Sequence, residues 1–559
     1  MKNIARLIKS VKAANQGSQT HPNREGAPSF YRSIKEQVVQ ILTTGTLSNT
    51  FYASTEQLGR EAIEVLLQAR QECPEFLAKA VAYARNEGLL KSMPVLGLAM
   101  LSGERKAKQY FQATFNQVVK TPDDLRAFVL LCKSGVIPGR KGLGGMTRDA
   151  VANWLGNLSE YHTMKYGSAV SREITLRDIL RLAHPKPQNE ALSERFGYLV
   201  SGKRALSANS GLNPQIRMLE TLKRATTEEE TLNLVREGKL PFEVVIPAVK
   251  ATTPAIWSAL LHNAPYFNLL RNLVTFTRHQ VFLSEAEVEY AVQRLTDARA
   301  VERSKVLPFR YFQAWQQYVA MENPDSLIAD ALRQALELSF VNMPSLGSCQ
   351  IAIGTDTSGS MGSQVSEKSS TRFIDIAGIF TGALLRKAEG RVIPLPFDTE
   401  IHINHGLSGR DEILTTTDKI SHWCGGGTAV GAPIQFLLDR RISVDVFIGI
   451  TDQEEWAYGG GYPCRGSFLD LWHEYRKQVN PHCKAYLVTI APYRDAVAPQ
   501  GEEGIRFTYG WNDSVLGYIA NDLAGGASQI QAIEQMELEF VGDNGPLSET
   551  ASEDAQIED

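Results

Sequence analysis

The sequence predicts two folds in one chain: a long array of α-helices followed by a doubly wound α/β domain. A chain of 559 residues is longer than one hydrophobic core usually serves. Helical patterns run from the N-terminus to about residue 345, and no strand-like alternation is visible there. From Cys349 onward, short apolar runs alternate with helical stretches, a pattern typical of a parallel sheet covered by helices.

The helical half is predicted from caps and apolar spacing. In TPDDLRAFVLLCKSG, Thr121 can cap a helix that begins at Pro122, with Asp124 at its third position. In LSEAEVEYAVQRL, Ser284 and Glu287 form a predicted capping box. More than 300 residues of short amphipathic helices indicate stacked helix pairs, an α-solenoid with irregular repeats.

The second half is predicted to contain parallel strands with helices between them, one of which starts at Phe373. The candidate strands are CQIAIGTD (349–356), RVIPLPFD (391–398), TEIHIN (399–404), VDVFIGITD (444–452), KAYLVTIAP (484–492) and IRFTYGW (505–511). With the junction at MPSLG (343–347), the predicted domains are 1–345 (helical), 346–540 (α/β) and 541–559 (an acidic, disordered tail).

Charge is divided between the halves. The net charge of −4 would by itself argue against nucleic acid. Residues 1–345, however, carry 43 Lys and Arg against 32 Asp and Glu, whereas the remainder carries 15 against 30. A basic helical half joined to an acidic α/β half indicates a polyanion-binding domain beside a domain of another function.

The chain is expected to be cytoplasmic. The N-terminal MKNIARLIKSVKAANQ is too polar for a secretory signal, and no stretch reaches the length of a membrane span. The six cysteines include no CxxC pair, so we expect reduced and mostly buried thiols.

Oxygen-bearing side chains follow three apolar or Gly-rich segments of the second half. GTDTSGSMGS places Asp356, Ser358 and Ser360 after a strand; Thr428 follows three glycines ahead of a helix near Ala432; Asp452 ends the strand VDVFIGITD. Carboxyl ends of parallel strands meet at one sheet edge, and hard oxygen ligands suit Mg²⁺. A Gly-rich turn with Asp356 and Ser358 as helix caps would explain one segment only.

This pattern, DxSxS…T…D, resembles the metal-ion-dependent adhesion site of von Willebrand factor A domains. The resemblance implies a divalent cation, Mg²⁺ above all, held by Asp356, Ser358, Ser360, Thr428 and Asp452. An aspartyl phosphotransferase would want a second carboxylate where Ser358 stands, and no P-loop, HExxH or GxSxG motif is present. Binding is therefore favoured over catalysis.

A helical array followed by this A domain resembles the Ro autoantigen family of TROVE-module RNA-binding proteins. The likeness is carried by the segments TTGTLSNTFYAS (43–54), GRKGLGGMTRDAVANWL (139–155), MKYGSAVSREITLRDILRLAHPKP (164–187), LLRNL (269–273) and VLPFRYFQAW (306–315). It implies HEAT-like repeats closed into a ring by the A domain. It also implies Y-type small RNAs bound on the outer basic surface, and single-stranded 3′ ends of misfolded RNAs or rRNA precursors in the hole.

The resemblance further implies a monomeric protein within a ribonucleoprotein, without catalysis of its own. Its partner would be a 3′ exoribonuclease, with polynucleotide phosphorylase the example among bacterial members. No membrane partner is implied.

Several residues suit contact with RNA on this interpretation. Each has a plain alternative: solvated surface charge, a helix cap for His184, or a structural ion pair for Arg271. The candidates are Arg140, Lys141, Arg148, Lys165, Tyr166, His184, Lys186, Arg271, Asn272 and Arg310. Two other functions stay open: a metal-dependent protein–protein adaptor acting through the A domain, and a metal-dependent nuclease at Asp356 and Asp452.

Overall fold

The computed structural model describes residues 20–540, apart from short gaps at 45–54, 139, 141, 168–173, 208–210, 307, 341–345, 347, 366–368, 389–390, 492 and 511–513. The chain forms two compact units. Unit 1 comprises residues 1–93, 307–313 and 336–537, and unit 2 comprises 94–306, 314–335 and 538–559. The division falls within helices α5 (Ser92–Ser102), α19 (Pro308–Val319) and α20 (Ser326–Leu338).

A five-stranded parallel sheet forms the centre of unit 1, in the order β4-β3-β5-β6-β8. Its strands are β3 (Ile351–Asp356), β4 (Val392–Phe397), β5 (Val446–Thr451), β6 (Lys484–Thr489) and β8 (Ile505–Tyr509). Five of the six predicted strands are therefore confirmed. The sixth, 399–404, is wrong: the chain turns back after β4 and makes only an isolated bridge between Phe397 and Ile401.

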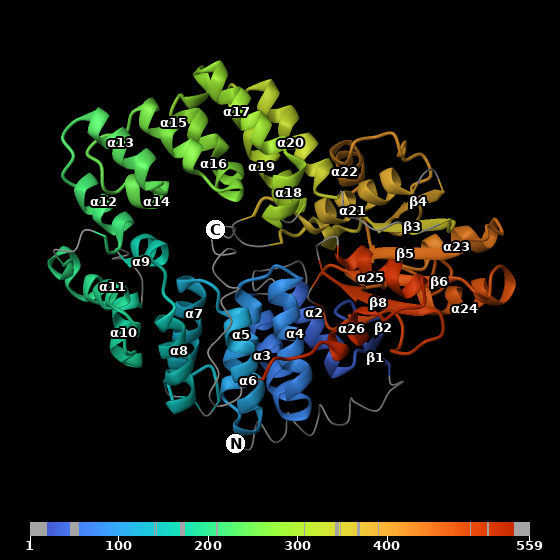
Figure 1. Ribbon diagram of the computed structural model, residues 1–559. Coiled ribbons are helices and arrows are strands. Elements are labelled where there is room, and N and C mark those ends of the chain that lie inside the picture. Colours follow the sequence, from blue (N-terminus) through green and yellow to red (C-terminus); the bar gives the residue numbers. More distant parts are fainter. Residues whose placement is uncertain are drawn as a thin grey trace. The chain divides into compact units, whose positions relative to one another are not determined.

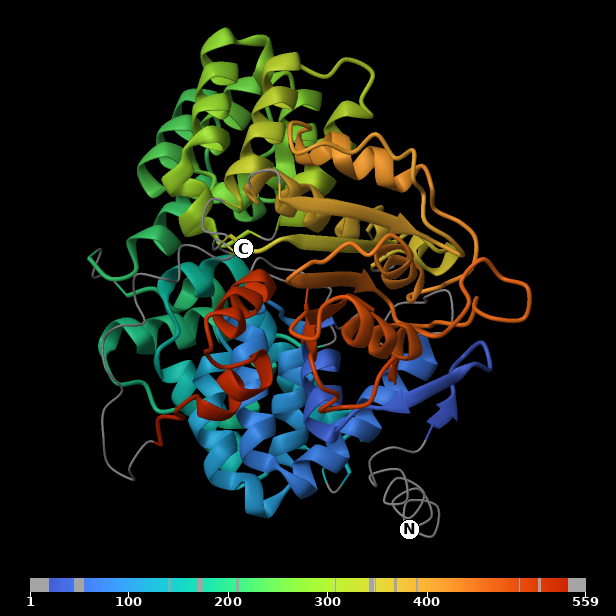
Figure 2. The same cartoon turned by 90° about the vertical axis from the view of Figure 1, so that its right-hand side faces the viewer.

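Helices lie on both faces of this sheet, as Figures 1 and 2 show. Alternation along β3 explains the two layers: Thr355 bonds Thr381 of the helix at 373–387, whereas Ala352 packs with the opposite layer. Gly354 is required for close packing, because a Cβ there would lie 2.8 Å from the ring of Phe447. The helices are α21 (Phe373–Lys387), α22 (Ile413–Ser421), α23 (Ala432–Asp439), α24 (Phe468–Gln478), α25 (Ser514–Leu523) and α26 (Gln529–Gln535).

The N-terminal part of the chain belongs to the same unit as this sheet. Strands β1 (Thr20–Pro22) and β2 (Pro28–Tyr31) form a hairpin, and β2 pairs with β7 (Asp495–Ala496). The expectation of no strand before residue 345 is wrong, because strands this short cannot display alternation. Three helices follow: α2 (Ile34–Thr44), α3 (Thr55–Glu72) and α4 (Pro74–Asn86).

Unit 2 is helical, and its helices pack mainly against near neighbours in sequence, as a solenoid requires (Figure 1). They are α6 (Lys108–Val118), α7 (Pro122–Lys133), α8 (Gly145–Gly156), α9 (Glu160–Gly167), α10 (Leu176–Ala183), α11 (Glu190–Ser201), α12 (Pro214–Leu222), α13 (Glu228–Gly238), α14 (Phe242–Val245), α15 (Pro254–Asn263), α16 (Tyr266–Arg278), α17 (Glu285–Thr296) and α18 (Ala298–Ser304). Short 3₁₀ turns lie at Arg105–Ala107 (η1), Gly202–Ala205 (η2), Val281–Leu283 (η3) and, in unit 1, Gly359–Gly362 (η4). None of the described helices is long and apolar enough to cross a membrane.

The two predicted helix caps have different outcomes. The capping box of Thr121 and Asp124 at the start of α7 is confirmed. Ser284 does stand at the N-cap of α17, but its side chain makes no cap bond. Glu287 instead accepts hydrogen bonds from Ser258 and pairs with His262 on α15, because a tertiary partner outcompetes the local one.

The contact between α2 and the C-terminal half can be tested at Gln40, whose buried side-chain amide donates to the carbonyls of Ala491 (2.9 Å) and Tyr493. Gln40→Ala removes both of these buried hydrogen bonds, so we expect a loss of about 1–3 kcal/mol in unfolding free energy. Thermal unfolding measures this loss. Gln68→Ala on α3, whose amide bonds only Glu72 at the surface, serves as the control and should cost under about 0.5 kcal/mol. Equal stability of the two variants would contradict the contact.

Candidate functional site

Three loops at the carboxyl edge of the parallel sheet supply one cluster of oxygen atoms in unit 1. Strand β3 ends at Asp356, and β5 ends just before Asp452. Thr428 precedes α23. All five predicted ligands are buried, with exposed fractions of 2% or less. The predicted parallel pairing thus brings the DxSxS, Thr and Asp segments to the same edge.

Backbone hydrogen bonds join these loops to one another. The amide of Gly359 donates to the carbonyl of Gly426 over 3.2 Å, and the amide of Trp456 donates to the carbonyl of Thr428 over 3.0 Å. Because the bonds run between loops, the positions of the hydroxyls and carboxylates are set by the backbone.

Glycines 426 and 427 allow this close approach. Gly426 has a φ of +70°, and a Cβ there would lie 2.7 Å from Asp398 Oδ2. A Cβ on Gly427 would lie 2.6 Å from the ring of Trp456. Of the three glycines before Thr428, Gly426 and Gly427 therefore stand where a Cβ would clash, and Gly426 also has a left-handed backbone conformation.

Hydrogen bonds orient the first carboxylate. Asp356 Oδ1 accepts from the amide of Ser358 at 2.9 Å, and Oδ2 accepts from the hydroxyl of Thr451 at 2.6 Å. The hydroxyls of Ser358 and Ser360 lie 3.1 Å apart. Neighbouring donors thus fix the direction of Asp356 while the two serine hydroxyls stay together.

Two atoms of the cluster lack partners. Thr428 Oγ1 and Asp452 Oδ2 are buried and make no hydrogen bond to any described residue. Buried polar atoms are usually satisfied, and a bound ion is one way to satisfy them. A hard divalent cation with oxygen ligands fits this donor set. The described residues contain no cluster of three or more His, Cys, Asp or Glu side chains that could form another kind of metal site.

Burial makes the two carboxylates costly to ionise. It is the largest cause of the raised pKa of Asp356, to about 7, and the charge of Asp452 raises that pKa further. The pKa of Asp452 is also raised, again mainly by burial. A cation between the two would favour the ionised forms and reverse both effects.

Asp398 also lies at this edge and was not predicted. It directly follows β4 as Asp452 follows β5, and its Oδ1 accepts hydrogen bonds from Thr399 and Glu400. Because local amides already occupy this carboxylate, it shapes the loop that holds Gly426. Its position directly after an apolar strand was the available sequence signal.

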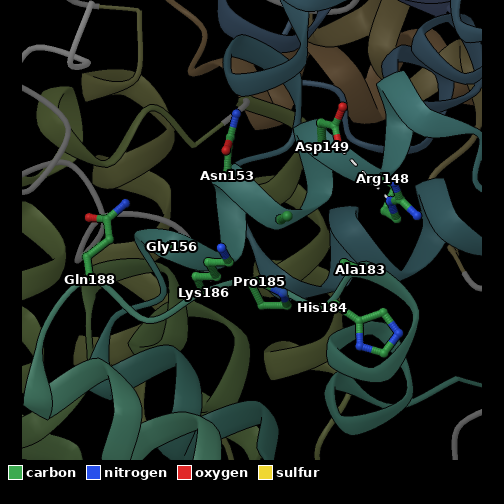
Figure 3. Close-up of a pocket in the computed structure, with 10 residues that line it drawn as sticks. Arg148, Asp149, Asn153, Gly156, Ala183, His184, Pro185, Lys186 and Gln188 are labelled. Carbon is green, nitrogen blue, oxygen red and sulfur yellow. Dashed lines mark ion pairs between the residues drawn. The ribbon is translucent and has the colours of Figure 1, made fainter.

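A second candidate site lies in unit 2, where α8 meets the segment after α10. A pocket of about 440 Å³ is lined by Arg148, Asn153, His184 and Lys186, among others. Figure 3 shows Arg148 and Asp149 on α8 and His184 and Lys186 on the facing segment. Three of the predicted RNA contacts, separated by up to 38 residues, therefore share one pocket.

The local conformation explains the place of His184. It is the C-cap of α10 in the left-handed region, with φ +50°, and its amide donates to the carbonyl of Leu180. The two prolines that follow prevent continuation of the helix. His184 is thus both the C-cap of α10 and a residue that lines the pocket.

Comparisons with known proteins agree with this arrangement. A family model described as the TROVE domain matches residues 245–345, and one described as the Ro60 vWA domain matches residues 350–521. The chain is therefore similar to Ro proteins in both its helical and its α/β parts.

Two relatives carry the name RNA-binding protein RO60. That of Deinococcus radiodurans is 24% identical over 488 residues, which cover 82% of this chain and 88% of the relative. That of Caenorhabditis elegans is 26% identical over 467 residues, 71% of this chain and 70% of the relative. The crystal structure of the Deinococcus radiodurans RO (RSR) protein has the same fold, with a TM-score of 0.62 and 20% identity over 88% of this chain and all of that one.

Within unit 2, Arg140 has a structural position. Its guanidinium donates to the carbonyl of Ser102 at the end of α5 and to the hydroxyl of Thr147 in α8, at 3.2 Å for the latter. Burial lowers its pKa. Arg140 thus ties two helices together, and its role as an RNA contact stays a prediction. Lys141 lies outside the described residues.

The predicted pair Lys165 and Tyr166 is likewise internal. The Lys165 side chain is 6% exposed and pairs with Glu243 at 3.4 Å. The Tyr166 ring is buried beneath the guanidinium of Arg126. Since α9 is packed by its neighbours, neither side chain offers a surface on which a base could stack.

The remaining candidates are not among the residues that line the pocket. Arg271 is exposed on α16 over the ring of Phe267, and Asn272 donates to the carbonyl of Asn268. Arg310, on α19 in unit 1, bonds Gln313.

Replacing Thr428 with valine tests the oxygen cluster. Because its hydroxyl bonds none of the described residues, we expect Thr428→Val to leave unfolding free energy in EDTA within about 0.5 kcal/mol of wild type. With Mg²⁺ at 100 times its dissociation constant, wild type should gain about 2.7 kcal/mol and the variant less. Thermal unfolding with and without Mg²⁺ reports both.

Thr416→Val on α22 is the matched control, since its hydroxyl is equally buried and unpartnered among the described residues. It should respond to Mg²⁺ like wild type. An equal Mg²⁺ response in Thr428→Val would remove Thr428 from the ligand set, and no response in wild type would argue against a cation at this edge.

Proposed function

We propose that this protein binds structured small noncoding RNA, of the Y-RNA type, on the basic surface around the α8–α10 pocket. The observation that carries the proposal is the convergence of Arg148, His184 and Lys186 on that pocket. Two cations and an imidazole suit phosphate oxygens, and the lining contains no Phe, Tyr or Trp ring to stack on a base. Recognition would therefore depend on shape and backbone.

The acidic residue at the pocket does not cancel this charge. Asp149 approaches Arg148 only to 4.0 Å, and 53% of the Arg148 side chain stays exposed. An exposed pair of this kind is worth little, so the guanidinium can exchange it for a phosphate.

Single-stranded 3′ ends of misfolded RNAs or rRNA precursors are the second proposed ligand, held within a ring. Support comes from the path of the chain: it leaves unit 1 after Met93 and returns to it through 307–313 and again at 336. Both ends of the helical array are thus covalently joined to the same unit, which supports the proposal of a ring. Arg271 and Arg310 are the proposed contacts to the threaded strand. The proposed setting is a cytoplasmic ribonucleoprotein with one copy of this chain and a 3′ exoribonuclease such as polynucleotide phosphorylase.

Binding without catalysis is proposed for the A domain. Ser358 occupies the place where a nucleophilic or acidic second carboxylate would stand. A second candidate function, a protein–protein adaptor, is favoured by the unpartnered Thr428 Oγ1 and Asp452 Oδ2. Together with Asp356, Ser358 and Ser360 they would hold Mg²⁺, which supplies a Lewis-acidic position for an acidic group of a partner.

Reversing charge in the pocket tests the RNA proposal. For Arg148→Glu with Lys186→Glu, we expect affinity for a labelled RNA duplex with a single-stranded 3′ tail to fall at least about tenfold at 100 mM salt. The slope of log affinity against log salt should decrease by about 2. Fluorescence anisotropy across a salt series measures both quantities.

The control is Arg236→Glu with Arg303→Glu, which changes net charge equally at exposed positions on α13 and α18. Unchanged affinity in the pocket variant, or an equal loss in the control, would contradict the pocket as the RNA site. Failure of wild type to bind any RNA at low salt would favour the adaptor.

Metal removal separates the two candidate functions. The pocket residues lie in unit 2 and the oxygen cluster in unit 1. We therefore expect EDTA, or Thr428→Val, to change RNA affinity by less than about twofold. A larger loss, measured in the same anisotropy assay, would contradict independent sites.

A further inference from the structure

A second basic pocket lies at the other end of α10, at its first turn. Its volume is about 730 Å³, and it is lined by Arg177, Val200, Ser201, Gly202, Arg204 and Ala205. None of the lining residues is acidic or aromatic. The residues come from the first turn of α10, the end of α11 and the 3₁₀ turn η2.

Two glycines build this pocket. Gly202 ends α11 with φ +64° and reverses the chain into η2. Gly197 lets that turn lie flat on α11, because a Cβ there would come within 2.9 Å of the Ala205 Cβ. These two glycines thus keep Arg204 beside the end of α11. If the chain continued as a helix, Arg204 would lie farther along the helix axis.

One arginine of the pocket is positioned from behind. The Nε atom of Arg177 donates to the carbonyl of Leu199 at 3.1 Å. This bond fixes the guanidinium while its two terminal nitrogens take part in no ion pair with any described residue. Arg204 is exposed and likewise has no acidic partner in the described part of the chain. A planar guanidinium with free terminal nitrogens is suited to phosphate oxygens.

Helix α10 connects this pocket to the one at Arg148. Arg177, Arg181 and His184 are spaced four and three residues apart, so they share one helical face, and all three are exposed. The seven residues from Arg177 to His184 span about 10 Å along the axis. This is well under one turn of a nucleic-acid duplex, about 34 Å, so one RNA molecule can reach both pockets.

From this arrangement we propose that the pocket of Arg177 and Arg204 is a second phosphate-binding subsite, which holds the sugar–phosphate backbone of the RNA bound at the Arg148–His184–Lys186 pocket. The inference rests on the proposed RNA-binding function. Ser201 supplies a hydroxyl to the same backbone, and Val200 and Ala205 supply apolar contact to ribose. In the absence of a stacking ring, the subsite contacts backbone and not unpaired bases.

The test compares three double variants in the anisotropy assay: Arg177→Glu with Arg204→Glu, Arg148→Glu with Lys186→Glu, and the control Arg236→Glu with Arg303→Glu. The probes are the tailed RNA duplex, a blunt RNA duplex and a single strand. For the Arg177/Arg204 variant we expect at least about tenfold weaker binding of both duplexes at 100 mM salt, with the slope of log affinity against log salt lowered by about 2. Between 50 and 200 mM salt, the affinity of this variant should therefore fall about tenfold less than the affinity of wild type.

Because Arg177 also bonds Leu199, the single variant Arg204→Glu, which breaks no hydrogen bond between described residues, is measured alongside. We expect this single variant to keep the wild-type unfolding temperature. It should lower the slope of log affinity against log salt by about half as much as the double variant does. Wild-type affinity and slope in both subsite variants, with loss in the Arg148/Lys186 variant, would overturn the subsite and leave the proposed function standing. Absence of RNA binding by wild type would overturn the proposed function itself. Loss confined to the single strand would overturn the assignment to a structured RNA backbone.

Discussion

Parallel pairing of β3 with its neighbours β4 and β5 is the interaction on which the arrangement of unit 1 depends. It sets three strand ends side by side, each with an aspartate: Asp356 is the last residue of β3, and Asp398 and Asp452 directly follow β4 and β5. Two of these carboxylates are buried where ionisation is costly, as the raised pKa of Asp356 shows. The free-energy cost of burying these two carboxylates has to be offset by favourable interactions, and the hydrogen-bond donors around Asp356 offset only part of it. Thr428 Oγ1 and Asp452 Oδ2 bond none of the described residues, and the proposed cation would bind them and offset the remaining cost.

Sequence predicted this unit well because its signals are local. Apolar runs of six residues marked β3, β4 and β5, and the residues that follow them had to meet once the strands were parallel. The strand predicted at 399–404 failed for a physical reason: Asp398 takes the amides of residues 399 and 400 onto its own carboxylate and turns the chain. The β1–β2 hairpin could not be predicted, since β2 pairs with a strand more than 460 residues away.

The basic residues of the helical half were harder to assign, because charge alone does not say which face of a helix is covered. Arg140, Lys165 and Arg148 look equivalent in sequence. In the structure, Arg140 joins two helices and Lys165 pairs with Glu243, whereas Arg148 remains exposed. Packing of neighbouring helices decides this difference, and packing has no short-range pattern. The second basic pocket was missed for the same reason, since Arg177 and Arg204 lie 27 residues apart and meet only through the turn at Gly202.

The two kinds of site place opposite demands on their surroundings. The oxygen cluster of unit 1 is almost fully buried. The proposed cation would compete with protons for its carboxylates, and the affinity for that cation would depend on the exclusion of water and on the backbone bonds that fix each ligand. The pockets on α8, α10 and α11 are exposed, and their cations act through a field that salt screens within about 10 Å at 0.1 M. The affinity of exposed cations for a nucleic acid depends on their number and spacing, because each contact to a phosphate releases about one counterion. A row of basic residues along α10 between two pockets meets that requirement, where any one of its arginines alone would not.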